Sequence, residues 1–137
     1  MSKFYLFVLT DMSCLLCLGY RVGQVQCVFT LPVQAICAWF HSTKPSFTHL
    51  AYIDWFTPFS PFPYNSNHQL YKVSRLRVQG EQVASVVPLH LIKQSVHLTP
   101  VFGPVAPIDW KSSNVLDLAR YFHVNPFSDR FSYSTLY

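Results

Sequence analysis

Charged side chains are scarce in this chain of 137 residues, since lysine, arginine, aspartate and glutamate together make up only 12% of it. This composition excludes the intrinsically disordered class, which is rich in charge and poor in apolar residues. Half of the residues are hydrophobic and 17% are aromatic, so the sequence predicts one packed domain. With so few charges to cover the surface, part of the apolar surface is expected to pack against another domain or chain.

Acidic side chains are the scarcest charged group, with six in the whole chain. Two-metal nuclease or transposase chemistry needs several carboxylates that converge on metal ions. Asp54 lies inside an aromatic segment, but no second acid occupies a neighbouring strand position. Asp117 and Asp129 lie close in sequence to Arg120 and Arg130, as expected for solvated ion pairs. We therefore predict no catalytic residues and no enzyme activity.

Motifs that bind phosphates or supply a nucleophile are also missing. The sequence holds no G-x-S-x-G, P-loop, G-x-G-x-x-G or H-E-x-x-H string. We accordingly predict no cofactor and no small-molecule substrate.

Cysteines are confined to the first 37 residues, a distribution unlike that of a secreted disulfide scaffold. The four are Cys14, Cys17, Cys27 and Cys37. The first two make half of a zinc signature, but no second C-x2-C or closely spaced histidine pair completes it. We predict small apolar cysteines, no metal site and a reducing, intracellular setting. His97 is expected to be buried and hydrogen-bonded.

Residues 1–20 form an apolar segment that resembles a secretory signal. Lys3 precedes a short apolar run, Phe4–Leu9, but Asp11 interrupts it and no small-residue cleavage site follows. The segment is also shorter than a membrane span requires, so membrane association is not expected. We expect residues 1–20 to lie outside the domain, which then covers residues 21–137. The alternative is a small secreted or membrane-tethered protein directed by this segment.

Short apolar segments bounded by proline and glycine predict a mainly β fold, a small barrel or curved antiparallel sheet with one or two short helices. The expected strands are 25–31, 49–56, 70–78, 82–89, one ending near Pro100 and one over 131–137, and the expected helices are 32–40 and 112–122. A turn is expected at 79–81. Strand 25–31 should place Val25, Cys27, Phe29 and Leu31 on one face.

Strand 49–56 is apolar on both faces and should be central, whereas strand 70–78 should be its basic neighbour at the edge of the sheet. Between residues 70 and 97 the charge sums to +3. Aromatic and basic side chains along a strand can bind phosphates or stacked bases. The candidate nucleic-acid-binding residues are Tyr71, Lys72, Arg75, Arg77 and Lys93. The alternative is that these charges only protect an edge strand from aggregation.

The strings HLAYIDWF, LYKVSR and SVHLTPVFGPVAP, with NVL and NPFSDR further on, carry a resemblance to a known family. From about residue 22 to its end, the sequence resembles the C-terminal region of fungal transposable-element proteins of the Plavaka or KDZ transposase type. Residues 1–20 resemble nothing in that family, and residues 33–39 carry less charge than its members do there.

The resemblance implies a non-catalytic accessory domain separated from the RNase H-like catalytic portion. By analogy, it suggests an SH3-like or bromo-adjacent-homology-like barrel that contacts DNA or another domain of a transposase. A nuclear location would follow from such an origin.

Overall fold

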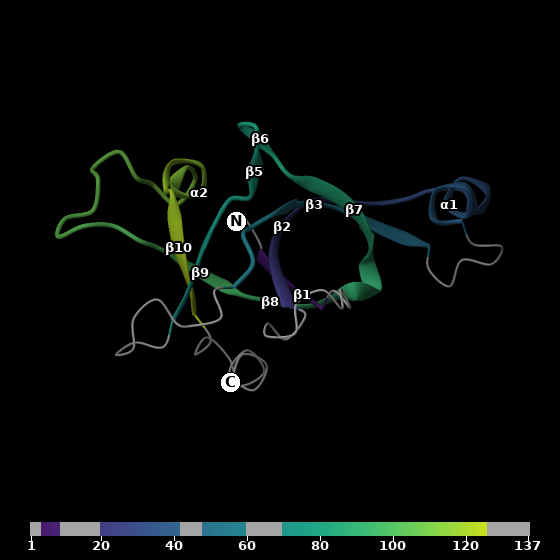
Figure 1. Cartoon of the computed structure of the whole chain (residues 1–137), viewed down its shortest axis with the longest axis horizontal. Helices are drawn as coiled ribbons and strands as arrows, with labels where there is room; N and C mark the ends of the chain where they lie inside the picture. The colour runs from purple at the N-terminus through teal and green to yellow at the C-terminus, as the bar shows by residue number, and fades with distance from the viewer. Residues whose placement is uncertain (1–3, 9–19, 42–47, 60–69, 126–137) are drawn as a thin grey trace.

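The structure is a computed structural model that describes residues 4–8, 20–41, 48–59 and 70–125 (Figure 1). In chain order its strands and helices are β1 (Phe4–Val8), β2 (Tyr20–Thr30), α1 (Val33–Phe40), β3 (His49–Trp55), β4 (Tyr71–Ser74), β5 (Arg77–Val78), β6 (Glu81–Gln82), β7 (Ala84–Pro88), the 3-10 helix η1 (Leu89–Leu91), β8 (Ile92–Ser95), β9 (His97–Pro100), α2 (Val115–Leu118) and β10 (Tyr121–Asn125). The prediction of a mainly β fold with short helices is therefore confirmed.

The strands form antiparallel sheets that do not close into a barrel. A five-stranded sheet has the order β7-β3-β2-β1-β8, a three-stranded sheet has the order β4-β10-β9, and β5 pairs with β6. The larger sheet curves strongly, but its edge strands β7 and β8 are joined only through η1 (Figure 1). Of the two predicted architectures, the curved antiparallel sheet is the one observed, and the closed barrel is not.

Residues 1–20 were expected to lie outside the domain, but residues 4–8 form strand β1 of the larger sheet. Strand β1 pairs with β2 on one side and with β8 on the other. An apolar stretch of five residues therefore contributes a strand to the sheet. The final strand expected over residues 131–137 lies outside the described residues.

Strand β2 ends before Pro32 as predicted, but its faces do not follow the predicted alternation. Its register shifts between Val25 and Cys27, which pair with Ile53 and Tyr52 of β3. Because consecutive residues of β3 point to opposite faces, Val25 and Cys27 also lie on opposite faces. Cys27 is consequently exposed, and the single apolar face predicted for residues 25–31 is wrong.

Strand β3 is central, as predicted, because it lies between β2 and β7. The basic segment expected at its side is divided instead. Residues 71–74 join the three-stranded sheet, and residues 77–78 form the β5–β6 hairpin. An isolated bridge between Phe56 and Arg75 connects the end of the β3 segment to this stretch, and Thr57 and Trp55 on either side of Phe56 make backbone hydrogen bonds with Ser74 and Leu76. Gln79 and Gly80 have φ values of 54° and 89°, which confirms the predicted turn.

The predicted strand near Pro100 is divided in the same way. After η1, β8 pairs with β1 of the larger sheet, and β9 pairs with β10 of the smaller one. Val96, between the two strands, is buried. This short segment therefore joins the two sheets.

The helix predicted over residues 112–122 is wrong in its second half. Helix α2 covers only Val115–Leu118, Ala119 is already extended, and Tyr121–Asn125 form the central strand β10. Strand pairing overrides the local helical spacing, because Phe122 is fully buried when it lies opposite Val73 and Pro100.

Helix α1 is confirmed, and it is almost wholly apolar. It ends where His41 adopts a left-handed φ of 49° and donates its N–H to the carbonyl of Cys37. Ile36 is buried, whereas Val33 and Trp39 are about half exposed. Among the described residues, no helix has the length and hydropathy needed to cross a bilayer.

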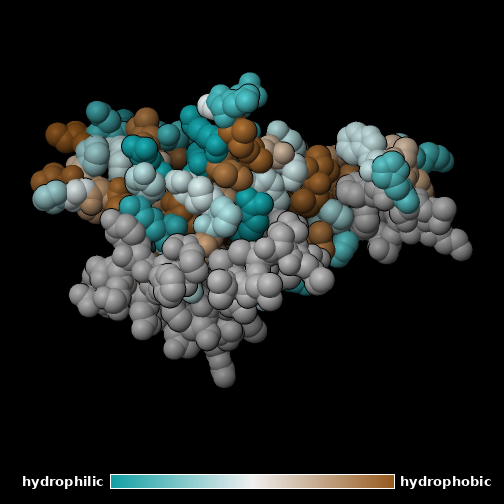
Figure 2. Space-filling view, in the orientation of Figure 1, coloured by the Kyte–Doolittle hydropathy of each residue, from teal (hydrophilic) through white to brown (hydrophobic). Residues whose placement is uncertain are grey.

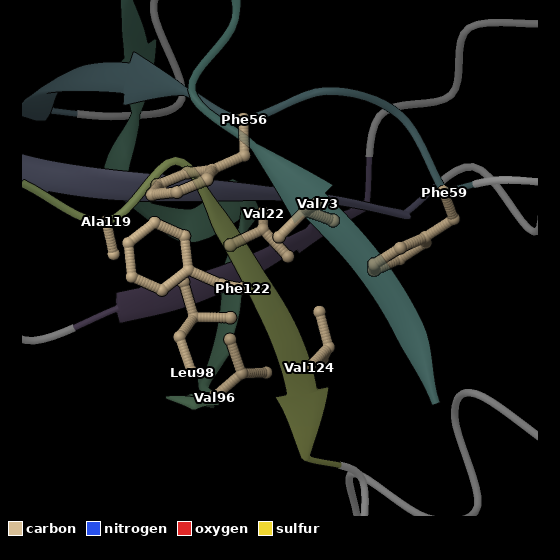
Figure 3. Packing of buried hydrophobic residues seen from close by; sticks show 9 residues of the cluster. All are labelled: Val22, Phe56, Phe59, Val73, Val96, Leu98, Ala119, Phe122 and Val124. Atoms are coloured by element: carbon tan, nitrogen blue, oxygen red, sulfur yellow. The ribbon is translucent and has the colours of Figure 1, made fainter. Parts of the chain in front are cut away.

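The main core lies between the three-stranded sheet and β2 (Figure 3). Its buried residues are Val22, Phe56, Phe59, Val73, Val96, Leu98, Ala119, Phe122 and Val124. The rings of Phe56 and Phe122 meet edge to face, with centroids 5.8 Å apart. A second cluster within the larger sheet contains Ala51, Ile53, Trp55 and Val87.

Replacing Phe122 by alanine tests the packing of the main core. We expect Phe122→Ala to lower the free energy of unfolding by about 3–5 kcal/mol, because it removes a fully buried ring and leaves a cavity. Urea denaturation followed by tryptophan fluorescence measures the change. The control is Val78→Ala, because the Val78 side chain is 59% exposed. This substitution should change the free energy of unfolding by no more than about 0.5 kcal/mol. Equal unfolding midpoints for the two variants would contradict this packing.

Candidate nucleic-acid interface

The outer face of the three-stranded sheet carries polar, basic and aromatic side chains. Across the three strands, Lys72, His123 and Thr99 occupy one row, and Ser74 lies opposite Tyr121 in the next. Residues directly opposite each other in antiparallel strands project to the same side. The intervening residues of β10, Phe122 and Val124, are buried in the main core, so both rows face away from that core. We call this surface the outer face.

Two cations gather around one aromatic ring on the outer face. The Lys72 Nζ lies 4.1 Å from the centroid of the Tyr121 ring, and the guanidinium carbon of Arg120 lies 5.3 Å from the same centroid. Both distances are within the range of cation–π attraction. Arg120 is exposed, whereas Lys72 and Tyr121 are half-buried. The ring therefore holds two positive groups close together at the surface.

The five residues proposed from the sequence do not form one surface. Lys72 lies on the outer face, but its neighbour Tyr71 packs against the main core, with its ring centroid 5.1 Å from that of Phe59. Arg77 is exposed on β5, and Lys93 is exposed on β8. These two strands lie at opposite sides of the molecule (Figure 1). The space-filling view shows the β5–β6 hairpin as a small hydrophilic projection (Figure 2).

Arg75 is the predicted residue whose position differs most from the expectation of a solvated or DNA-facing strand. Its side chain is only 13% exposed. The guanidinium Nε donates to the carbonyl of Leu116 at 3.2 Å, and Nη2 donates to Gln24 Oε1 at 2.9 Å and to Asp117 Oδ1 at 3.1 Å. Arg75 thus joins β4, β2 and α2, and its charge is engaged inside the fold.

Asp54 and Asp117 approach the same arginine from different elements. Asp54 Oδ2 lies 4.0 Å from Arg75 Nη1 and accepts a hydrogen bond from Gln26 Nε2 at 2.6 Å. Asp117 pairs with Arg75, which corrects the prediction that its partner is Arg120. Asp54 was expected to be isolated from other acids, but these contacts place it and Asp117 on either side of one guanidinium.

Potential metal ligands do not cluster in the part of the chain that the structure describes. No group of three histidine, cysteine or acidic side chains there could hold an ion. Cys27 and Cys37 are free thiols, and Cys14 and Cys17 lie outside the described residues. His97 was expected to be buried, but it is exposed on β9 opposite Asn125.

Sequence reasoning did not include Arg120, Tyr121 or His123 among the candidate binding residues. The signal was present, because YFHVN alternates polar and apolar side chains at the period of a strand. The preceding residues fit helical spacing equally well, and extending that helix to Phe122 concealed the alternation. Comparisons with protein-family models, curated proteins and solved structures found no match to this chain.

Arg75 should behave as a structural residue when it is replaced. We expect Arg75→Ala to lower the free energy of unfolding by about 3 kcal/mol, because it leaves Asp54 and Gln24 without their shared cation. Arg75→Lys should recover only part of this loss, since an ammonium cannot reproduce the guanidinium fork. Urea unfolding curves measure both effects.

The matched control is Arg77→Ala, which removes the same charge from an exposed position. It should change the free energy of unfolding by no more than about 0.5 kcal/mol. An unfolding midpoint for Arg75→Ala equal to that of Arg77→Ala would show that the internal contacts of Arg75 contribute nothing.

Proposed function

We propose that this chain is a non-catalytic accessory domain of a transposable-element protein, and that its outer face contacts the phosphate backbone of DNA. The observation that carries the proposal is the pair of cations, Lys72 and Arg120, around the ring of Tyr121. The resemblance of the sequence to transposable-element proteins supplies the biological setting, which implies a nuclear location.

Phosphate binding fits the chemistry of this surface. Lysine and arginine donate charge-assisted hydrogen bonds to phosphate oxygens, and hydroxyl side chains add neutral donors. Ser74 lies opposite Tyr121 on this face, and Thr99 lies in the same row as Lys72, on the other side of His123. The net charge of +4 favours the approach of a polyanion. Because the cations already lie over the ring of Tyr121, phosphates are better ligands here than stacked bases.

The acidic residues support a role without catalysis. Asp54 and Asp117 both interact with Arg75, and Asp54 also accepts a bond from Gln26. The guanidinium of Arg75 offsets one of the two negative charges, which weakens the attraction of this pair for a metal ion. Both acids are therefore best explained as parts of the internal network that fixes α2 to the sheets.

The salt dependence of the DNA-binding affinity distinguishes binding through phosphate contacts from binding that does not involve charge. Wild-type protein should bind a fluorescently labelled duplex with an affinity that falls steeply between about 50 and 200 mM salt. The double variant Lys72→Ala/Arg120→Ala should bind more weakly, and the slope of log K against log salt should become shallower by about 2, since each phosphate contact contributes about 0.9. Fluorescence anisotropy measures both quantities.

The control for this titration is Arg77→Ala/Lys93→Ala, which also removes two positive charges but leaves the outer face intact. Its salt slope should remain that of the wild type. If the salt slope becomes shallower in the control and stays at the wild-type value in Lys72→Ala/Arg120→Ala, DNA does not bind at the outer face. If the wild type does not bind at low salt, the proposed function is wrong.

Tyr121 allows a second test that keeps the net charge constant. Tyr121→Phe preserves the ring and should keep wild-type affinity, whereas Tyr121→Leu removes the ring that positions Lys72 and Arg120. The loss of binding free energy should be no larger than the roughly 0.5–1 kcal/mol by which the ring holds each exposed cation in place. Equal affinities for these two variants would show that the ring does not organise the cations.

A further inference from the structure

Residues 101–110, between β9 and α2, form a loop that exposes large apolar side chains. Ile108 is 96% exposed, Val105 is 80% exposed and Phe102 is 52% exposed. An isolated exposed apolar residue is common, whereas three on one loop of ten residues mark a candidate contact surface. The loop projects from the body of the molecule at the side of β10 and α2 (Figure 1). Hydrophobic residues are visible at that extremity of the surface (Figure 2).

Both ends of this loop are anchored to the rest of the fold. At its start, the Val101 N–H donates to the carbonyl of Tyr121 at 2.9 Å. At its end, Trp110 packs against the main core, and the Phe102 ring meets it edge to face with a centroid distance of 6.2 Å. Asn114 Nδ2 donates to the carbonyl of Asp109 at 3.0 Å. The exposed residues are therefore carried by a loop with a fixed base.

The loop begins beside the cation pair of the outer face. Val101 is bonded to Tyr121, whose ring lies beneath Lys72 and Arg120. Lys111 follows the loop directly and is exposed, while Asp109 is the one acid within residues 101–110. Asp117 of α2 is also exposed, but it pairs with Arg75. A projection that is apolar at its tip and has Lys111 and the cation pair near its base is complementary to DNA, which has anionic strands and an apolar interior of stacked bases.

We propose that Val105 and Ile108 act as a wedge that inserts between base pairs of a duplex held by the outer face. This inference rests on the proposed function, because the cations must first hold the duplex. Architectural DNA-binding proteins insert apolar side chains between base steps in this way, and the insertion kinks the duplex. Pro104 and Pro107 restrict the backbone around the two side chains, so less conformational freedom is lost when the loop inserts.

The experiment measures DNA bending separately from DNA binding. A duplex of about 25 base pairs carries a donor and an acceptor dye at its two ends, and a matched duplex carries 2-aminopurine near its centre. Wild-type protein should raise the energy transfer, since a kink of about 20–90° brings the ends together. It should also raise the 2-aminopurine fluorescence, because the base becomes unstacked.

The variant Val105→Ser/Ile108→Ser should bind with the salt slope of the wild type but without either spectroscopic change. Both side chains are exposed, so its urea unfolding midpoint should equal that of the wild type. The matched control Val78→Ser removes an exposed valine on β5 and should keep the bending signal.

The outcomes separate this inference from the proposed function. Binding by the wild type without a change in energy transfer or 2-aminopurine fluorescence overturns the wedge and leaves the phosphate contact standing. Absence of binding overturns both. A third experiment tests whether the loop binds a membrane surface, using vesicles of neutral lipid that contain about a third phosphatidylserine. Sedimentation with these vesicles that is lost in Val105→Ser/Ile108→Ser, together with an unbent duplex, would assign the loop to a membrane surface instead.

Discussion

Strand β10 lies between two partners and buries one of its faces, and this constraint determines what the smaller sheet presents to solvent. Phe122 and Val124 are fully buried in the main core, so the alternating residues Tyr121 and His123 must project from the opposite face. A shift of one residue in the register would bury the polar set and expose the apolar one. The position of the cation pair therefore follows from the packing of the core.

Arg75 links that packing to the rest of the molecule. Its guanidinium contacts groups from β2, β3 and α2, and its backbone bridges to Phe56 at the junction of the two sheets. A cation so enclosed stabilises the fold only while its partners are in place. The densest basic stretch of the sequence thus divides its charges among an internal network at Arg75, the outer face at Lys72 and the β5–β6 hairpin at Arg77.

The elements that sequence reasoning predicted are those with local signals. Pro32 ends β2, Gly80 permits the hairpin turn, and the apolar character of residues 49–55 indicates a central strand. The features that it missed depend on partners distant in the chain. The register shift after Val25 is fixed by pairing with β3 and has no local signal. Residues 121–125 carry the alternation of a strand, but the residues before them also fit helical spacing, and pairing with β4 and β9 decides between the two. The candidate surface was consequently predicted only in part: Lys72 was identified, but Arg120 and Tyr121 were not.

The most direct test of the proposed DNA contact is an NMR titration that maps which residues respond to a duplex. Uniformly ¹⁵N-labelled protein is titrated with a short duplex at low salt, and the backbone amide shifts are followed. The account predicts that the largest changes occur at Lys72, Arg120 and Tyr121, with little change at Arg77 and Lys93. Changes confined to β5 and β8, or no changes at all, would contradict it.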